Sequence, residues 1–481
     1  YIDSSLFGEA TVKRVEVPMS KPVWDEEHDS PSYPYPYGSP GWLSSGDFVV
    51  YDAYDIWRFN HKTRELVALT NSHGRDTESR MRVLNLEPEF DEGLNVKKGI
   101  DNSDGTITIQ TFHEPSKSSG IMMLDLASKR TKTLSFGNFK NSRFRRAKYA
   151  NSLLFFQETV DLSPNLFSYN LIEDSAFELR NKLLRLTNLN PQQDSFIWPK
   201  VEIINYRAFG KKMQGLLYTP ENISLNQSLP MIVYFYESYS DRLHDYKPPA
   251  PSASTINITW FVSNGYAVFI PDIIYKEGQP GMSALKCINN GVDRVLKAHK
   301  RIDPKRIGIQ GQSWGGYQTA FVITRTNRYA CAMAGAPVSN MFSAYGGIRY
   351  GSGMSRQFQY EKTQSRIGAT PWRRFDLYKK NSPVFFADNI DTPIMIMHND
   401  NDGAVPFTQG VELYMALRRL EKPVWMLVYN GEQHNLKKRA NRLDLSNRMG
   451  QFFDHYLKSA IKPDWMSKGR PLTEKPVQKN K

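Results

Sequence analysis

The 481-residue sequence has very few cysteines and no long apolar run. Cys287 and Cys331 are its only cysteines, which excludes a disulfide framework and a cysteine-rich metal site. We expect both to be buried thiols rather than a bridged pair. A membrane-spanning helix needs about 18 consecutive apolar residues, but polar residues interrupt the richest stretch, 260–275. We therefore expect no transmembrane segment.

The start of the chain lacks a methionine and a signal-like segment. Segments of that kind mark a protein for secretion or for another compartment. We expect that Tyr1 is not the native N-terminus, so the first residues do not indicate where the protein works.

Nucleic-acid-binding motifs are also lacking, although the net charge is +13. The basic residues gather at 143–146, at 437–439 and in the tail after Lys462. Without a motif that would present these side chains to phosphates, we interpret them as solvated surfaces. We expect no nucleic-acid partner.

One stretch carries the pattern of a nucleophile elbow. Residues 306–310 are β-branched and apolar at alternate positions, and residues 317–323 are typical of a helix. Between them, Gly311-Gln312-Ser313-Trp314-Gly315 forms G-x-S-x-G. A sharp strand-to-helix turn of this kind needs small residues around an exposed serine, so Ser313 is the candidate nucleophile.

The first part of the chain predicts a partial β-propeller. Short apolar strands, polar turns and second strands recur from about residues 55, 120 and 165, close to the ~40–50 residues of a propeller blade. A closed propeller needs at least four blades, and about three or four fit here. We expect residues 1–190 to be part of a propeller whose N-terminal blades lie elsewhere in the gene product or in a separate chain. A small independent β-sandwich is the alternative.

From about residue 196 the pattern changes to alternating strands and helices. This alternation predicts a mostly parallel sheet covered on both faces, and with the elbow in its middle it predicts an α/β-hydrolase domain over residues 191–465. A basic tail, 466–481, follows. The expected elements are strands at 201–204, 213–218, 231–236, 266–270, 306–310, 333–338, 393–397 and 424–429, and helices at 254–263, 283–299, 408–419 and 441–458.

A serine nucleophile needs a base and an acid, and in α/β-hydrolases these follow it in the order acid, then histidine. His434 lies in the loop after the last strand, where a mobile base is expected. Asp400 and Asp402 both follow the strand at 393–397, in a loop that resembles a calcium site. His398 and Gln409 occupy the end positions where that site needs carboxylates. We therefore interpret it as the acid loop, prefer Asp402 over Asp400, and expect no metal and no cofactor.

The negative charge that develops during acyl transfer needs two hydrogen-bond donors. The N–H of Trp314 is the first candidate. The H-G-G-G loop that supplies the second donor in many esterases is absent after the strand at 231–236. The phenol of Tyr236 is the candidate that takes its place, whereas Tyr234 and Phe235 are expected in the core.

With these motifs in place, the chain resembles the C-terminal part of a prolyl oligopeptidase family serine peptidase. The resemblance covers residues ~195–460 and rests on Gly311–Tyr317, on Gly335-Ala336-Pro337-Val338-Ser339, on the acid loop and on Gly431-Glu432-Gln433-His434. It implies a propeller joined to an α/β-hydrolase domain, a catalytic Asp402, an oxyanion tyrosine at Tyr236, and oligopeptide substrates.

The sequence departs from the family pattern at two positions, and the resemblance has further implications for location and substrate binding. Asn399 stands where the family has a glycine, and Ala404 where its dipeptidyl-peptidase branch has an asparagine. The tail at 463–471 resembles that of secreted bacterial members, which implies an extracytoplasmic location in a bacterium. The segment 339–380 is expected to line the substrate pocket, through Met341, Phe342, Tyr345 and Ile348.

The leading hypothesis is therefore a serine peptidase that cleaves oligopeptides through an acyl-enzyme, with Ser313, Asp402 and His434 as its triad. An esterase or lipase on the same fold is the first alternative. A non-catalytic, peptidase-like subunit of a larger assembly is the second.

Overall fold

The structure is a computed structural model that describes residues 19–86, 99–102, 104–147, 149–150, 152–171, 183–221 and 228–469, and the backbone of 2–3 and 11–12. The chain divides into two units. The first comprises Tyr1–His28, Tyr33–Pro191 and His244–Tyr246, and the second Asp29–Ser32, Gln192–Leu243 and Lys247–Lys481. The short segment Asp29–Ser32 therefore belongs to the second unit, although the chain on both sides of it belongs to the first.

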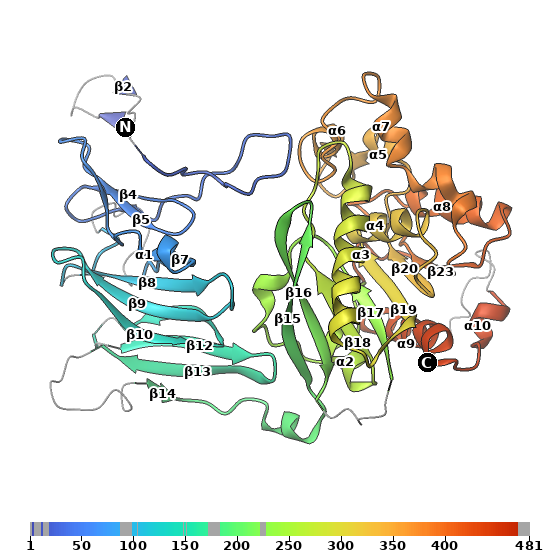
Figure 1. Ribbon diagram of the computed structural model, residues 1–481, viewed down its shortest axis with the longest axis horizontal. Helices are drawn as coiled ribbons and strands as arrows, with labels where there is room; N and C mark the ends of the chain where they lie inside the picture. Colours follow the sequence, from blue (N-terminus) through green and yellow to red (C-terminus); the bar gives the residue numbers. More distant parts are fainter. Residues whose placement is uncertain are drawn as a thin grey trace. The chain divides into compact units, whose positions relative to one another are not determined.

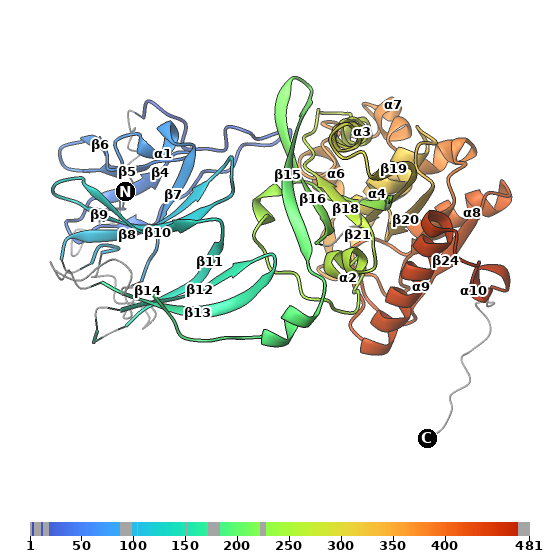
Figure 2. The ribbon, with the colours of Figure 1, turned by 60° about the horizontal axis from the view of Figure 1, so that its bottom comes forward.

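The first unit contains three antiparallel four-stranded sheets, each formed by strands in chain order (Figures 1 and 2). Two-residue strands β1 (Ile2–Asp3) and β2 (Thr11–Val12) pair with each other, and α1 (His73–Asp76) follows the first sheet. The first sheet has β3 (Gly41–Trp42), β4 (Phe48–Tyr51), β5 (Ile56–Phe59) and β6 (Leu66–Ala68). The second has β7 (Ser79–Val83), β8 (Thr106–His113), β9 (Ser119–Asp125) and β10 (Thr131–Gly137), and the third β11 (Lys140–Arg146), β12 (Ser152–Thr159), β13 (Leu162–Asn170) and β14 (Leu183–Arg185).

Successive sheets of this unit pack face to face. Val49 and Ile56 of the first sheet share a core with Ile107 and Leu124 of the second. Ile121, which points to the other face of the second sheet, packs with residues of the third. Such stacking of four-stranded sheets is the arrangement of propeller blades, so the predicted partial propeller is confirmed.

The irregular repeat in the sequence has a simple explanation. The predicted hairpins fall on different strands of successive blades: β4 and β5 in the first sheet, but β9 and β10 in the second. Strand β8 was not predicted, although Ile107 and Ile109 alternate with Thr106, Thr108 and Gln110 as in a half-buried strand. Strand β11 was read only as a basic cluster, yet Phe144 is buried between exposed Arg143 and Arg145. The repeat that starts at about residue 165 is expected to end in a second strand at 177–179, and these residues lie outside the described part of the chain.

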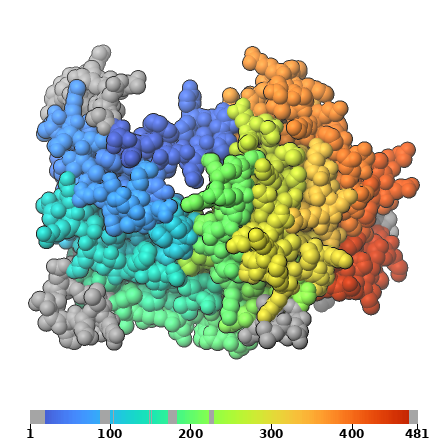
Figure 3. Space-filling view, viewed as in Figure 1, coloured from blue at the N-terminus to red at the C-terminus, as the bar shows by residue number. Residues whose placement is uncertain are grey.

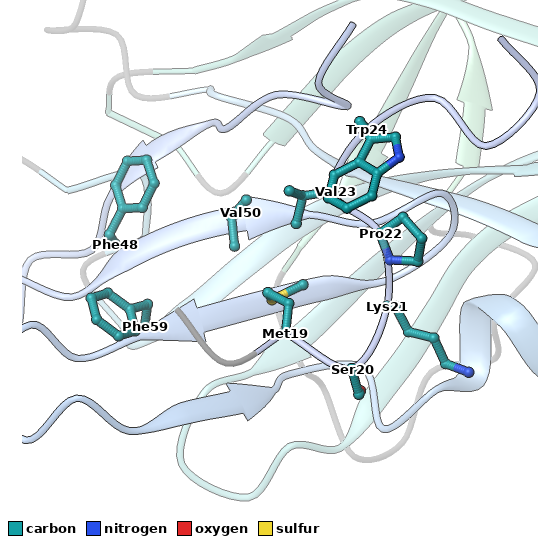
Figure 4. Close-up of a pocket in the computed structure, with 9 residues that line it drawn as sticks. All are labelled: Met19, Ser20, Lys21, Pro22, Val23, Trp24, Phe48, Val50 and Phe59. Atoms are coloured by element: carbon teal, nitrogen blue, oxygen red, sulfur yellow. The ribbon is translucent and has the colours of Figure 1, made fainter. Parts of the chain in front are cut away.

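The outer face of the first sheet is partly covered by an extended segment. Residues 19–24 run across Phe48 and Val50 of β4 and Phe59 of β5, and together they enclose a hollow of about 610 Å³ (Figure 4). Val49 and Tyr51, the alternate residues of β4, are buried on the other face. Because strand side chains alternate between faces, both faces of this sheet carry apolar residues: one face packs against the second sheet, and residues 19–24 partly cover the other.

The second unit is an α/β-hydrolase domain built on a mixed eight-stranded sheet of order β15-β16-β18-β17-β19-β20-β23-β24. The six strands from β18 to β24 in this order are parallel to one another, and β15 and β16 form the antiparallel edge. The strands are β15 (Pro199–Ala208), β16 (Lys211–Pro220), β17 (Leu229–Tyr234), β18 (Ala267–Pro271), β19 (Ile302–Gln312), β20 (Cys331–Gly335), β23 (Ile394–Met397) and β24 (Val424–Leu427), with a small hairpin of β21 (Ile348–Arg349) and β22 (Met354–Ser355).

Helices cover both faces of this sheet (Figure 2). Three of them, α3 (Pro280–Ala298), α4 (Trp314–Ile323) and α8 (Thr408–Arg419), share one core with the sheet. On the other face α2 (Ile258–Ser263) contacts α9 (Arg439–Lys458) through Phe261 and Phe453, whose rings are 5.7 Å apart. The shorter helices are α5 (Met341–Tyr345), α6 (Gln357–Glu361), α7 (Phe375–Lys380) and α10 (Asp464–Ser467).

In the space-filling view the elements of the second unit run from green through yellow to red (Figure 3). The predicted strands and helices are present, with bounds that differ by a few residues. Helix α8 is predicted residue for residue, whereas α2 begins at Ile258 because Asn257 caps it by accepting a hydrogen bond from Trp260 N–H. Cys287 and Cys331 are free and buried, as predicted.

In the part of the chain that the structure describes, no helix is both long and apolar enough to cross a membrane.

The glycines of the elbow generate the first testable prediction. A Cβ at Gly316 would overlap the carbonyl oxygen of Gly335, a main-chain atom that cannot move without distorting β20. We expect Gly316→Ala to lower the free energy of unfolding of the second unit by about 2 kcal/mol or more, measured by denaturant unfolding. Gly346→Ala is the control, because its backbone has φ −73° and the nearest atom to its added Cβ is 3.8 Å away. Equal stability of the two variants would contradict the predicted clash.

Candidate active site

The elbow joins the end of β19 to the start of α4, and Ser313 is the residue between them. Its backbone has φ 61° and ψ −113°, a strained conformation for a residue with a side chain. A Cβ at Gly311 would overlap the main chain of Gly315, and one at Gly315 would touch the carbonyl oxygen of Phe235. The G-x-S-x-G pattern is therefore required by close packing of main chain on main chain, which keeps Ser313 at the tip of the turn.

The loop after β23 separates the two candidate acids. Asp402 is 5% exposed, and its Oδ1 accepts hydrogen bonds from Ala404 N–H at 2.8 Å and Val405 N–H at 2.9 Å. Its Oδ2 lies 2.7 Å from Nδ1 of His434. Asp400 is exposed and accepts instead from Gly431 N–H. The geometry thus pairs His434 with Asp402 and not with Asp400.

The loop that carries His434 is held by its main chain. Nε2 of Gln312 donates to the carbonyl oxygen of His434 at 3.0 Å, and Nδ2 of Asn399 donates to that of Gln433 at 2.6 Å. On the far side of the loop, Glu432 accepts from the N–H groups of Lys437 and Lys438. These contacts bring the histidine loop against Gln312, the residue that directly precedes Ser313.

His398 is a second partner of the acid. It is fully buried, with Nε2 3.1 Å from the carbonyl oxygen of Val405 and 3.5 Å from Oδ2 of Asp402. Burial by itself would raise the pKa of Asp402, but hydrogen bonds from His398 and His434 and the charge of His434 hold this pKa well below the usual range of an aspartate. Asp402 is therefore an anion at neutral pH and can orient His434.

Nδ1 of His434 donates its proton to Asp402 in this arrangement, which leaves Nε2 as the acceptor toward the nucleophile. His434 keeps 21% of its side chain exposed, and Ser313 is half-buried. Among the residues described, the Ser313 hydroxyl has no hydrogen-bond partner. Catalytic hydrogen bonds are often long before substrate binds, and the contact between Ser313 and His434 stays a prediction.

The two candidate oxyanion donors lie on either side of Gly315. Tyr236 follows β17 and is 36% exposed, and its ring carbon Cδ2 is 3.7 Å from the position of a Cβ at Gly315. Trp314 begins α4 and is buried. Phe235 is fully buried in the core, as expected, whereas Tyr234 is only partly buried and does not belong to the core.

Tyr275 connects these two residues. Its hydroxyl accepts from Nε1 of Trp314 at 2.9 Å and from Nε2 of Gln318 at 2.5 Å, and it donates to the carbonyl oxygen of Tyr236 at 3.2 Å. Burial raises the pKa of Tyr275 well above its usual value, so its hydroxyl stays protonated. The main chain of Tyr236 and the indole of Trp314 are thus tied to one buried phenol.

The four predicted pocket residues have different surroundings. Met341 and Tyr345 are buried, and the Tyr345 hydroxyl donates to Glu361 at 2.7 Å. Phe342 is partly buried against the rings of Phe375, Tyr378 and Phe385, whereas Ile348 is 47% exposed. Helix α5 carries the first three and β21 begins at Ile348. Their role in a pocket stays a prediction.

Several residues around the site were not identified from the sequence. Gln312 could have been suspected because it sits next to the nucleophile. Gln364, whose Nε2 donates to the Tyr236 hydroxyl at 3.1 Å, gives no local signal at all. The sequence marks His398 only as an end position of the calcium-like loop, and Asn399 only as a departure from a family pattern. Their roles depend on neighbours that are distant in the sequence.

The buried Asp402 carboxylate generates a pH prediction. Its pKa is held low in the folded chain and is about 3.9 when unfolded. Its stabilising contribution is therefore complete above about pH 4 and is lost as the pH falls through that value toward the folded pKa. We expect the difference in unfolding free energy between the unmodified chain and Asp402→Asn to shrink from pH 7 to pH 3. Denaturant unfolding at each pH tests this, and a constant difference would contradict it.

Comparison with known proteins shows what the chain is similar to. Residues 251–460 match the model of the Prolyl oligopeptidase family. The chain is 29% identical over 173 residues to the uncharacterized peptidase YuxL of Bacillus subtilis, covering 35% of this chain and 25% of that protein. It is 25% identical over 334 residues to the lasso peptide isopeptidase AtxE2 of Asticcacaulis excentricus, covering 66% and 45%. The match spans less than half the length of either relative.

The structure is similar to that of dipeptidyl peptidase 4 from Porphyromonas gingivalis, with a TM-score of 0.63, 17% sequence identity, and coverage of 87% of this chain and 55% of the other. At this identity the likeness shows a common fold, a propeller with an α/β-hydrolase domain. The family match lies on the hydrolase domain and includes Ser313, Asp402 and His434. Over residues 251–460, the chain is therefore similar to the Prolyl oligopeptidase family.

Proposed function

We propose that the protein hydrolyses peptide bonds of oligopeptides through an acyl-enzyme formed on Ser313. The observation that carries this proposal is the 2.7 Å hydrogen bond between Asp402 and His434, in a loop held against the elbow. A buried anion paired with a partly exposed imidazole, in a loop bound to the residue before a strained serine, is the arrangement expected to activate a hydroxyl at neutral pH. The names of similar proteins, an isopeptidase and a dipeptidyl peptidase, support peptides as the substrate class.

In the first step Oγ of Ser313 attacks the carbonyl carbon of the scissile bond, and its proton passes to Nε2 of His434. Asp402 stabilises the imidazolium that forms, and its hydrogen bond keeps the ring in the required tautomer. The tetrahedral intermediate then collapses, the C–N bond breaks, and His434 gives its proton to the leaving amine.

The N–H of Trp314 and the O–H of Tyr236 donate to the oxyanion of that intermediate. These two donors stabilise the oxyanion most if they are already in position before the charge develops, because no free energy is then needed to reorient them. Tyr275 provides that rigidity for both residues through its buried hydroxyl.

In the second step a water molecule attacks the ester carbonyl of the acyl-enzyme. His434 removes the water proton and returns a proton to Oγ of Ser313, which releases the acid product and restores the site. The same residues thus serve both halves of the reaction, and we propose no metal or cofactor.

Specificity is proposed to come from the segment after β20. Met341, Phe342, Tyr345 and Ile348 supply an apolar, aromatic lining for the residue before the scissile bond. Ala404 takes the position of an asparagine in the dipeptidyl-peptidase branch, so we do not extend dipeptidyl specificity to this chain. The propeller part is proposed to limit substrates to short peptides, and an extracytoplasmic location is proposed on the sequence likeness of the tail at 463–471.

Covalent labelling tests the nucleophile. We expect a fluorophosphonate probe to label the chain, Ser313→Ala to abolish labelling, and His434→Gln to slow it by about 1,000-fold or more, because a serine without its base is a poor nucleophile. Ser263→Ala, which changes an exposed serine at the end of α2, is the control that keeps full labelling. A folded chain that is not labelled would refute the proposal and favour a non-catalytic subunit.

Substrate preference separates a peptidase from an esterase. We expect measurable hydrolysis of a peptide anilide with an apolar residue before the anilide, and loss of this activity by about 10- to 1,000-fold in Tyr236→Phe, as for removal of one oxyanion donor. Steady-state turnover of the anilide and of a short-chain ester gives the comparison. Turnover of the ester with none of any peptide would support the esterase alternative.

A further inference from the structure

We propose that Gln364 is a positioning residue that aims the phenol of Tyr236 at the oxyanion, and that Arg366 and Asp29 hold Gln364 in place. The inference rests on the proposed function, since it concerns the same transition state. It adds residues from two segments that carry no recognisable motif: the stretch after α6 and the chain ahead of the first propeller blade.

The side chain of Gln364 has a defined direction. Its Nε2 donates to the Tyr236 hydroxyl at 3.1 Å, and its Oε1 accepts from Nε2 of Gln359 at 2.7 Å. Because Gln359 occupies the carbonyl end of the amide, the NH₂ end faces the phenol. The Tyr236 ring is confined on its other side by the elbow, where Gly315 leaves room for it.

This direction matters because a phenol has one proton to donate. If its oxygen accepts a hydrogen bond from Gln364, its own O–H is not used within the protein and can point at a substrate oxyanion. Hydrogen bonds in such a chain also polarise one another, so an accepted bond strengthens the donated one. An acceptor at the same place would do the opposite, because it would compete for the phenol proton.

The main chain of Gln364 is anchored by a buried arginine. Nη1 of Arg366 donates to the Gln364 carbonyl oxygen at 2.7 Å and lies 3.2 Å from Oε1 of Glu237, the residue after Tyr236. Its guanidinium also stacks 4.1 Å from the ring centre of Tyr275. Arg366 is 7% exposed, and although burial lowers its pKa, Glu237 and Asp29 raise it above the usual value.

Asp29 completes the anchor from a distant part of the chain. Its Oδ1 accepts from Nε of Arg366 at 2.8 Å, and its Oδ2 accepts from the N–H of Tyr275 at 2.9 Å. The Asp29 carboxylate therefore binds both Arg366, which anchors Gln364, and the main chain of Tyr275, whose hydroxyl connects Trp314 to Tyr236. This explains why Asp29–Ser32 belongs to the second unit while its neighbours in the sequence do not.

The test is a double-mutant cycle with Tyr236→Phe, using hydrolysis of a peptide anilide by the full chain. We expect Gln364→Leu to lower kcat by about 3- to 10-fold with little change in KM, the mark of an interaction made in the transition state. In the Tyr236→Phe background, where there is no phenol to aim, the same substitution should change kcat by less than about 2-fold. An equal effect in both backgrounds, or none in the unmodified chain, would overturn the proposal.

Gln364→Glu gives an independent readout. Its carboxylate would accept the Tyr236 proton, so we expect a lower kcat than for Gln364→Leu at neutral pH. The kcat of Gln364→Glu divided by that of Gln364→Leu should rise toward 1 as the pH falls, because the new carboxylate is then protonated. A pH-independent ratio, or a Glu variant more active than the Leu variant, would contradict competition for the phenol proton.

Asp29→Asn tests the remote anchor. We expect a fall in kcat of about 2- to 5-fold that becomes smaller in the Tyr236→Phe background, where only the part transmitted through Tyr275 to Trp314 remains. Asp376→Asn, which breaks an exposed ion pair with Arg374 on α7, is the matched control and should leave kcat unchanged. Thermal unfolding of each variant separates misfolding from mispositioning. Failure of the proposed function itself would look different: the unmodified chain would neither hydrolyse the anilide nor react with a fluorophosphonate.

Discussion

The hydrogen bond between Asp402 and His434 depends on strands that end in register. Gln312, Gly335, Met397 and Leu427 are direct neighbours across β19, β20, β23 and β24, in one row at the carboxyl edge of the sheet. Each strand delivers its loop to the same edge, as ligands and catalytic groups meet in open parallel sheets. Displacing one strand by a single residue would reverse its side chains and separate the acid from the base.

Few side chains around that bond take part in the proposed chemistry. Most of them bind main-chain atoms of the surrounding loops. Gln312 and Asn399 bind carbonyl oxygens of the histidine loop, and Glu432 binds two of its N–H groups. Tyr275 does the same for the oxyanion side through the carbonyl oxygen of Tyr236. Buried amides and phenols suit this task because they stay uncharged while satisfying polar main-chain atoms that water cannot reach.

Two features that the sequence did not explain, Asn399 and Asp29, have a physical role in holding the site together. An asparagine at 399 replaces a glycine and provides the amide that holds Gln433, so it is not a neutral change. Asp29 similarly turns a proline-rich stretch, which looks like a plain connector, into part of the catalytic unit. Both cases depend on a short polar side chain reaching main chain or arginine that folding alone brings within about 3 Å.

The sequence by itself determined the elements and indicated Ser313 as the candidate nucleophile, because those signals are local: alternation and helical period report burial within a few residues, and an elbow needs glycines beside its serine. It also narrowed the acid to Asp400 and Asp402 and the base to His434 through chain order. Only the tertiary structure decided between the two aspartates, since both follow the same strand and differ in which one faces His434. Gln364, Arg366 and Asp29 were beyond sequence reasoning for the same reason: a hydrogen bond between residues more than 100 positions apart leaves no periodic trace in the chain.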